Sequence, residues 1–179
     1  MGNKAVEIDC SQFEQFISQV EAAGNGEFKK AVQNFLKELG NKFLEIVEEQ
    51  IISRNVMDTR LLLNSFHKGD SGNIWKFESG GMSLEIGTNV KYASYVNDGH
   101  WTNPKGVAKR FIPGDVKVDS NGKIIEFTYN PGAETGITLK QKWIEGKHYW
   151  EGSIRAMNKL IPKYLEKKLS EWLSEYFGL

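Results

Sequence analysis

The sequence has almost no cysteine and no long apolar run. Cys10 is the only cysteine among 179 residues, so an internal disulfide and a zinc site built from several thiolates are both excluded. No apolar stretch reaches the length of a membrane span. The N-terminal segment contains Glu7, Asp9 and Glu14 and lacks the basic and apolar regions of a signal peptide. We therefore expect a protein that stays in the cytosol after synthesis and does not enter a membrane.

The chain also has no net charge. Lys plus Arg and Asp plus Glu both number 23. A neutral molecule has no overall field that draws it to nucleic acid or to an anionic membrane, so any contact with nucleic acid would have to be local. A nucleic-acid-binding module is therefore an alternative that the composition disfavours, while a local contact with DNA stays open.

Signatures of catalysis are missing as well. The three histidines are far apart in the sequence, and none has a second ligand at metal-binding spacing: His67, His100 and His148. There is no phosphate-binding glycine loop and no nucleophile elbow. The sequence thus predicts no catalytic residue, no metal site and no cofactor. We predict that the protein is not an enzyme, and a small hydrolase with an unrecognised site is the alternative from that class.

Helical periodicity dominates the first third of the chain. Ser11 is a suitable N-cap for a short helix that ends near Gly24. Apolar residues from Phe28 to Ile51 then form one stripe with charged residues opposite, which predicts a long amphipathic helix. Asp58 is a suitable N-cap for a third, short helix.

Alternation of apolar and polar residues then indicates strands. Residues 74–78 and 82–86 alternate on either side of Ser79-Gly80-Gly81, which predicts a β-hairpin. A second and clearer hairpin is predicted for residues 116–129, because Asn121-Gly122 tolerates the positive φ angles of a tight turn. Two antiparallel pairs make at least one small sheet.

The segments between and after these hairpins have other patterns. Val90–Val96 is compatible with a helical turn or with a strand. The two prolines and three glycines of Asp98–Gly114 predict a long loop. From Tyr149 onward apolar residues follow helical spacing to the C-terminus, and Pro162 predicts a kink or a break within that helix.

The order of helices, strands and helix predicts an α+β fold, in which a small antiparallel β-sheet is packed by N-terminal helices and a long C-terminal helix. The length suits one domain, so we predict a single domain over residues 1–179. Its parts are the N-terminal helices (1–57), the sheet and loops (58–145) and the C-terminal helix (146–179).

Two groups of side chains are candidates for contact with partners. Aromatic residues on irregular segments often anchor interfaces, and the candidates are Tyr92, Tyr95, Trp101, Trp143 and Trp150. For the tryptophans, packing within the chain is an equal alternative. The second group is basic and lies in the predicted loop, where no acidic residue occurs between Gly99 and Asp115: Lys105, Lys109 and Arg110. These cations could face DNA or a protein partner.

Three stretches of the chain together resemble the motifs of one protein family. The first is Asp58-Thr59-Arg60-Leu61 with Ser65-Phe66, which is similar to that family's Asp-Thr-Gly-x-Leu-x-x-Ser-aromatic signature. The second and most specific runs from Ile86 to His100 and contains Tyr92-Ala93. The third, Gly146-Lys147-His148-Tyr149-Trp150, resembles the aromatic start of the family's terminal helix. The family is that of the phage tail-component and neck proteins, which includes head-tail joining and tail-completion subunits. Arg60 stands where its members usually carry glycine, and Asn97 where they carry glutamate.

The resemblance implies a structural virion protein without catalysis, a ring-forming neck or tail-completion subunit that joins the head connector to the tail tube. It implies a homo-oligomeric ring, hexameric or dodecameric, whose partners are the head connector or stopper and the tail terminator or tail tube protein. A tail terminator of the same particle is the alternative within the family. The resemblance also implies a host-cytoplasmic chain that becomes part of the virion neck or tail. In such a ring the basic residues Lys105, Lys109 and Arg110 are candidates to face the channel and to contact packaged DNA weakly, and a protein partner is the alternative.

Overall fold

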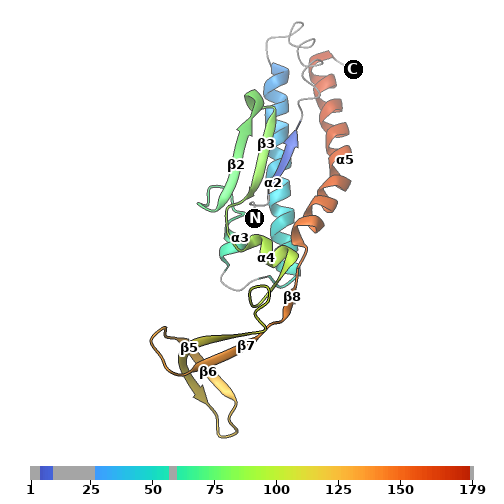
Figure 1. The fold of residues 1–179 in the computed structure, drawn as a ribbon. Helices are drawn as coiled ribbons and strands as arrows, with labels where there is room; N and C mark the ends of the chain where they lie inside the picture. The colour runs from blue at the N-terminus through green and yellow to red at the C-terminus, as the bar shows by residue number, and fades with distance from the viewer. Residues whose placement is uncertain (1–4, 10–26, 57–59, 178–179) are drawn as a thin grey trace. The chain divides into compact units, whose positions relative to one another are not determined.

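The computed structural model describes residues 5–9, 27–56 and 60–177, which form two compact units (Figure 1). Unit 1 combines the chain up to Asn97 with the chain from Lys147 onward, and unit 2 is the stretch Asp98–Gly146. Unit 1 combines helices with a small antiparallel sheet, and unit 2 consists of small antiparallel sheets, which confirms the predicted α+β class for the chain. The helix predicted between Ser11 and Gly24 and the N-cap predicted at Asp58 lie outside the described residues. The prediction of one domain over 1–179 stays a prediction.

A three-stranded antiparallel sheet forms one layer of unit 1. β2 (Asn73–Glu78) and β3 (Ser83–Thr88) make the predicted hairpin. The 3-10 turn η2 (Ser79–Gly81) closes it, with positive φ at both glycines. β1 (Ala5–Asp9) pairs with the other edge of β3, so the strand order is β1-β3-β2. β1 was not predicted.

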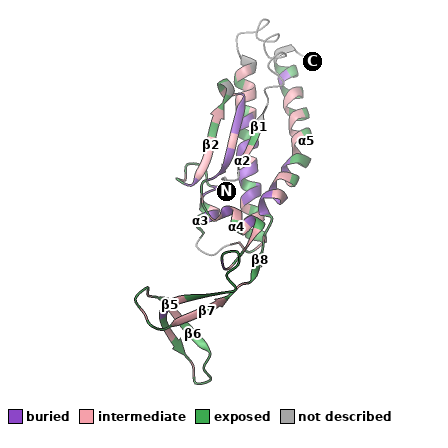
Figure 2. Ribbon diagram, in the orientation of Figure 1, coloured by how far each residue is buried: buried purple, intermediate pink, exposed green. Residues whose placement is uncertain are grey.

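Two long helices also belong to unit 1. α2 (Glu27–Ser53) and α5 (Tyr149–Phe177) lie side by side, and α2 also contacts β3 (Figure 1). Figure 2 shows that the buried residues follow the inner faces of these elements. The largest fully buried apolar side chains are Leu36, Leu39, Phe43, Val47, Ile51, Phe66, Leu84, Ile86 and Tyr149. Each such side chain contributes about 1.5–3 kcal/mol to folding, so this core is the main source of stability in unit 1.

Gly40 permits the close approach of α2 to the sheet. A Cβ atom at this position would come within 2.6 Å of Trp75 Cη2 and 2.7 Å of Leu84 Cδ2. Glycine lowers helix propensity by about 1 kcal/mol relative to alanine. Here the close packing against the sheet offsets that loss.

Two short helices lie near the C-terminal end of α2 (Figure 1). α3 (Leu61–Asn64) begins after Arg60, whose φ of 60° lies in the left-handed region that glycine adopts most readily. Members of the phage family that the sequence resembles usually carry glycine at this position. The predicted third, short helix spans 4 residues, and Ser65 and Phe66 follow it as buried turn residues. α4 (Ala93–Asp98) resolves the alternatives for Val90–Val96 in favour of a helix.

α5 runs through Pro162 without a break. The break that the sequence allowed does not occur because contacts hold the helix on both sides of the proline. Met157 is buried before it, and Ile161 and Tyr164 pack against the same core. The proline itself is exposed and removes only one backbone donor.

Unit 2 consists of short strands. β4 (Gly99–Trp101) pairs with β8 (Trp143–Glu145) where the chain enters and leaves the unit. The first half of β5 (Lys109–Val118) pairs with β7 (Gly136–Lys140). Its second half pairs with β6 (Ile124–Tyr129), which gives the order β6-β5-β7.

Two predictions for this region had different outcomes. The β5–β6 pair confirms the hairpin predicted for residues 116–129, with Gly122 at a φ of 76°. The long loop predicted for Asp98–Gly114 is wrong, because only residues 102–108 lie between β4 and β5. Pro113 was interpreted as a loop residue, but it sits where β5 changes its partner from β7 to β6, a position at which a missing N–H is tolerated.

Candidate assembly surfaces

The residues of unit 1 that flank unit 2 in the sequence are neighbours in space. Lys147 N donates to Val96 O at 2.8 Å, and His148 N donates to Asn97 O at 3.0 Å. Arg54 Nη1 also donates to Lys147 O at 2.9 Å. The chain therefore leaves and re-enters unit 1 between neighbouring residues, and unit 2 is an insertion between α4 and α5.

The buried side chain of Asn97 organises this junction. Its Oδ1 accepts a hydrogen bond from Trp150 N at 2.8 Å, and its Nδ2 donates to the two oxygens of Glu151 at 2.8 and 2.9 Å. The amide thus caps α5 from a distant part of the chain and holds a carboxylate near the positive end of that helix. A glutamate at position 97 would place a second carboxylate beside Glu151, so asparagine suits this chain.

Trp150 belongs to the core, although its position in the sequence made it an interface candidate. Its ring packs edge-on against Phe43 with centroids 5.4 Å apart and lies 5.9 Å from the Phe66 ring. Because it is buried, it has no surface to offer a partner, and we remove it from the candidate interface. Tyr92 is half-buried against the same core, whereas Tyr95 is exposed on α4.

Trp101 and Trp143 form an exposed pair on the two-stranded β4–β8 ribbon. They lie directly opposite each other in the strand register, with ring centroids 5.4 Å apart in an edge-on arrangement. Their exposed fractions are 54% and 37%. Both were interface candidates, but no local pattern in the sequence indicates that they are neighbours. Their role in an interface stays a prediction.

The three-stranded sheet of unit 2 has one apolar and one polar face. Alternate residues of a strand share a face, and so do residues opposite each other in neighbouring strands. By this rule one face, which we name the apolar face, carries Ile112, Val116, Val118, Phe127, Tyr129, Ile137 and Leu139. Ile124 and Ile125 lie beside a register shift at Lys117/Val118, and both are exposed. The opposite face is mostly polar and carries Lys109, Phe111, Asp115, Lys117, Glu126, Thr128, Thr138 and Lys140. Every residue of the apolar face is half-buried or exposed, so this layer remains uncovered within unit 2.

The structure separates the basic residues that the sequence grouped. Lys109 lies opposite Lys140 on the polar face, while Arg110 lies opposite Leu139 on the apolar face. Lys105 is in the turn that precedes β5. Lys109 therefore lies beside Lys140 at the end of β7, and Arg110 points away from both. Lys105 and Lys142 join this group because Gln141 Nε2 donates to the carbonyl of Pro104 at 3.3 Å.

Two members of this group, Lys140 and Lys142, were not predicted. Lys140 is the last residue of an alternating apolar and polar run, Gly136–Lys140, and Lys142 follows it. This pattern is typical of a strand and could have indicated both lysines as candidates. We name the four residues Lys105, Lys109, Lys140 and Lys142 the lysine cluster. All four side chains of the lysine cluster are exposed.

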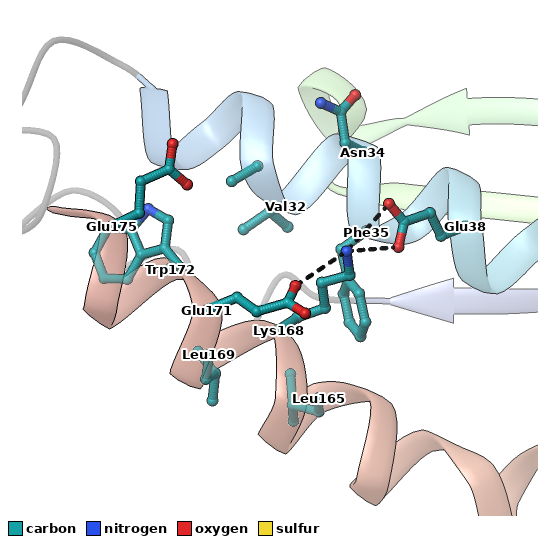
Figure 3. A pocket seen from close by; sticks show the side chains of 11 residues that line it. Val32, Asn34, Phe35, Glu38, Leu165, Lys168, Leu169, Glu171, Trp172 and Glu175 are labelled. Carbon is teal, nitrogen blue, oxygen red and sulfur yellow. Dashed lines mark hydrogen bonds and ion pairs between the residues drawn. The ribbon is translucent and has the colours of Figure 1, made fainter. Parts of the chain in front are cut away.

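A groove of about 250 Å³ lies between α2 and α5 (Figure 3). Its apolar lining includes Phe35 and Trp172. Lys168 Nζ lies 3.0 Å from Glu38 Oε2 and 3.4 Å from Glu171 Oε2. The hydrogen bond to Glu38 raises the pKa of Lys168, so the lysine stays protonated at neutral pH and is unsuited to act as a base. These three charged side chains of the groove are thus engaged with one another.

The described part of the chain holds no cluster of metal-ligating side chains. Within residues 5–9, 27–56 and 60–177, no three side chains of His, Cys, Asp or Glu gather as metal ligands. His67 Nε2 lies 3.4 Å from Glu48 Oε1 on the surface of unit 1. No helix in these ranges is long and apolar enough to cross a bilayer.

Comparison with known proteins identifies relatives along most of the chain. Residues 14–99 match the family described as "Bacteriophage HK97-gp10, putative tail-component". The phage-like element PBSX protein XkdI of Bacillus subtilis (strain 168) is 42% identical over 161 residues, which covers 90% of this chain and 95% of XkdI. The uncharacterized protein YqbI of the same strain is 38% identical over 167 residues, which covers 92% of this chain and 96% of YqbI. No solved structure gives a significant match.

The family match and the two relatives cover different parts of the chain. The family match ends where unit 2 begins. Each alignment with a B. subtilis relative leaves out a tenth of the chain or less, whereas unit 2 makes up more than a quarter, so both alignments cover most of unit 2. Identity of about two residues in five across nearly the whole of both chains confirms the resemblance found in the sequence. The protein therefore belongs to the HK97-gp10-like family of bacteriophage tail components.

Proposed function

We propose that this protein is a structural subunit of the neck or tail-completion assembly that joins head to tail, and that it forms a ring there. Membership of a tail-component family supports a role in the particle, and the relative XkdI is named as a protein of a phage-like element. The observation that carries the proposal further is the uncovered apolar face of unit 2. In this proposal the chain resides in the virion neck or tail and has no catalytic role.

The apolar face is a suitable contact for a ring subunit. Seven apolar side chains share a single sheet layer, and the largest exposed apolar patch of a domain is often an interface. From strand spacing and rise, the face covers roughly 300 Å². A stable pairwise interface buries about 800 Å² on each partner, so one such contact is weak by itself. Ring closure gives each subunit two contacts, and a head-to-tail interface closes when its rotation divides a full turn.

A second copy of this chain is the partner we propose for the apolar face. The net charge of zero means that copies do not repel one another. Unit 1 also offers exposed apolar side chains on neighbouring elements, namely Ile52 on α2, Leu61 on α3 and Tyr95 on α4. Packing the apolar face of one copy against this part of the next copy would be a heterologous contact, which is the kind that generates rings.

The direct test is quantitative mass spectrometry of purified, DNA-filled particles, in which this chain is counted against the portal subunit. A constant small-ring ratio is expected. Absence from particles would refute the structural role.

A pair of variants tests the apolar face itself. Val118 and Phe111 are 55% and 54% exposed on opposite faces of the same strand, so they are matched in exposure. Val118→Glu should reduce incorporation into particles by about tenfold or more, which corresponds to a decrease of about 1.4 kcal/mol in the free energy of association. Phe111→Glu should leave incorporation within about twofold of wild type. If the two variants behave alike, the apolar face is not the contact.

A further inference from the structure

We propose that the lysine cluster of unit 2 binds the phosphate backbone of duplex DNA without sequence preference. The inference rests on the proposed function in one respect, because a head-tail junction brings DNA to the chain. The rest follows from charge and strand register within unit 2.

Backbone contacts hold the four lysines in one region. Lys109 and Lys140 are directly opposed in the antiparallel register of β5 and β7. One residue further along, Gln141 N donates to Ala108 O at 2.8 Å. Thr102 N then donates to Lys142 O at 2.9 Å, and Gln141 Nε2 donates at 3.3 Å to the carbonyl of the residue before Lys105. The cluster is therefore defined by the pairing of two chain segments.

The two segments that carry the cluster are free of acidic residues. Residues 99–114 and 135–144 contain no Asp or Glu. Among the described residues, no ion pair involves any of the four lysines. In the distal half of the same sheet, by contrast, Lys117 Nζ lies 2.7 Å from Glu126 Oε2. Like charges directly opposite each other destabilise a strand pair, so an anion bound between Lys109 and Lys140 would relieve a repulsion present in the free protein.

The composition of the cluster favours phosphate over an acidic protein surface. Lysine is depleted at protein–protein interfaces, where arginine is preferred. An exposed lysine is a compact, hydrated point charge that suits non-specific phosphate contacts and the release of counterions. The one arginine of the region, Arg110, points to the other face of the sheet. The cluster thus has the chemistry of backbone binding and lacks the bidentate donors of sequence reading.

The test is the salt dependence of DNA binding by the full-length protein. A fluorescent duplex of roughly 20 base pairs is titrated between about 25 and 200 mM salt, and removal of one phosphate contact should reduce the slope of log K against log salt by about 0.9. Lys109→Gln/Lys140→Gln is compared with Lys117→Gln/Lys123→Gln, which removes the same charge from the distal half of the sheet. We expect the first variant to lower the slope by about 2 and the second to leave it unchanged.

Three results would overturn the inference. They are no binding by the wild type at the lowest salt, equal losses in both double variants, and displacement of the DNA by polyglutamate at equal charge concentration. Thermal unfolding is measured alongside, and Lys109→Gln/Lys140→Gln should not lower the melting temperature, because it removes a repulsion. Particle stoichiometry separates this inference from the proposed function. A chain present in the particle as a ring but unable to bind DNA refutes only the lysine cluster's role.

Discussion

The core of unit 1 is closed, with the rings of Phe43, Phe66 and Trp150 packed together and buried, whereas unit 2 spreads its apolar side chains over one open face of a single sheet. A sheet layer without a second layer has no closed core of its own. The contrast teaches that unit 1 depends on a closed core for its stability, whereas unit 2 leaves an apolar layer uncovered. Substitutions of the same kind should therefore have different effects in the two units.

The largest difference is expected between two tryptophans. Trp150→Ala removes a buried ring from the core of unit 1 and should lower the free energy of unfolding by about 3–5 kcal/mol. Trp143→Ala truncates an exposed ring of unit 2 and should cost about 1 kcal/mol or less. Urea unfolding followed by far-UV circular dichroism measures both. Equal losses would show that unit 2 has a packed core after all.

A smaller difference is expected between two asparagines. Asn97→Ala leaves Trp150 N and the Glu151 carboxylate without their buried partner and should cost about 1–3 kcal/mol in the same unfolding experiment. Asn130→Ala removes two exposed bonds in unit 2, from Gly132 N to Asn130 Oδ1 at 3.1 Å and from Asn130 Nδ2 to Asp115 Oδ2 at 3.3 Å, and should cost less than about 1 kcal/mol. An Asn97→Ala protein as stable as wild type would mean that the junction does not anchor α5.

Glycine at the helix–sheet contact gives a third and smaller effect. Gly40→Ala forces a methyl group against Trp75 and Leu84, which costs about 1–3 kcal/mol, while the gain in helix propensity returns about 1 kcal/mol. A net loss of about 1 kcal/mol is expected in thermal and urea unfolding. Gly152→Ala is the comparison, because the atoms nearest to its Cβ would be the far ends of the Gln50 and Arg54 side chains and not a packed core side chain. Stabilisation by Gly40→Ala would contradict the close packing.

Deletion of the whole of unit 2 should cause the smallest loss of stability in unit 1. Replacing Asp98–Gly146 with a tight turn keeps Val96 and Lys147 adjacent and shortens the loop that must close, so the unfolding free energy of unit 1 should not fall by more than about 1 kcal/mol. Incorporation into particles should nevertheless be abolished together with the apolar face. A deletion variant that fails to fold would show that unit 1 depends on unit 2.

Local patterns predicted the elements whose partners are close in sequence or whose stripe is long. α2 and α5 followed from apolar spacing, and the two hairpins followed from alternation around Ser79-Gly80-Gly81 and Asn121-Gly122. β1 could not be found in this way, because its only partner among the described strands, β3, is more than 70 residues distant. β4 and β8 are three residues each, too short to carry a period.

The candidate surfaces were predicted only in part. Aromatic and basic residues could be named from the sequence, but whether a tryptophan is buried depends on contacts such as that between Trp150 and Phe43. Likewise, the separation of Lys109 from Arg110 follows from strand alternation, which the prolines and glycines of that segment concealed. The pairing of Lys109 with Lys140 requires the register of β7, and no local pattern encodes a register.

The adjacency of Asn97 and His148 also bears on the order in which the chain folds. For Tyr149 and Trp150 to reach the core, the chain must first return across the whole of unit 2. Closing a flexible loop of about 50 residues costs roughly 3 kcal/mol of chain entropy. The β5–β6 hairpin forms locally, and once β4 pairs with β8 the ends of the insertion are already together. We therefore expect that unit 2, once folded, brings the start of α5 to its docking site, so that a segment with little core of its own speeds the closure of the core of unit 1.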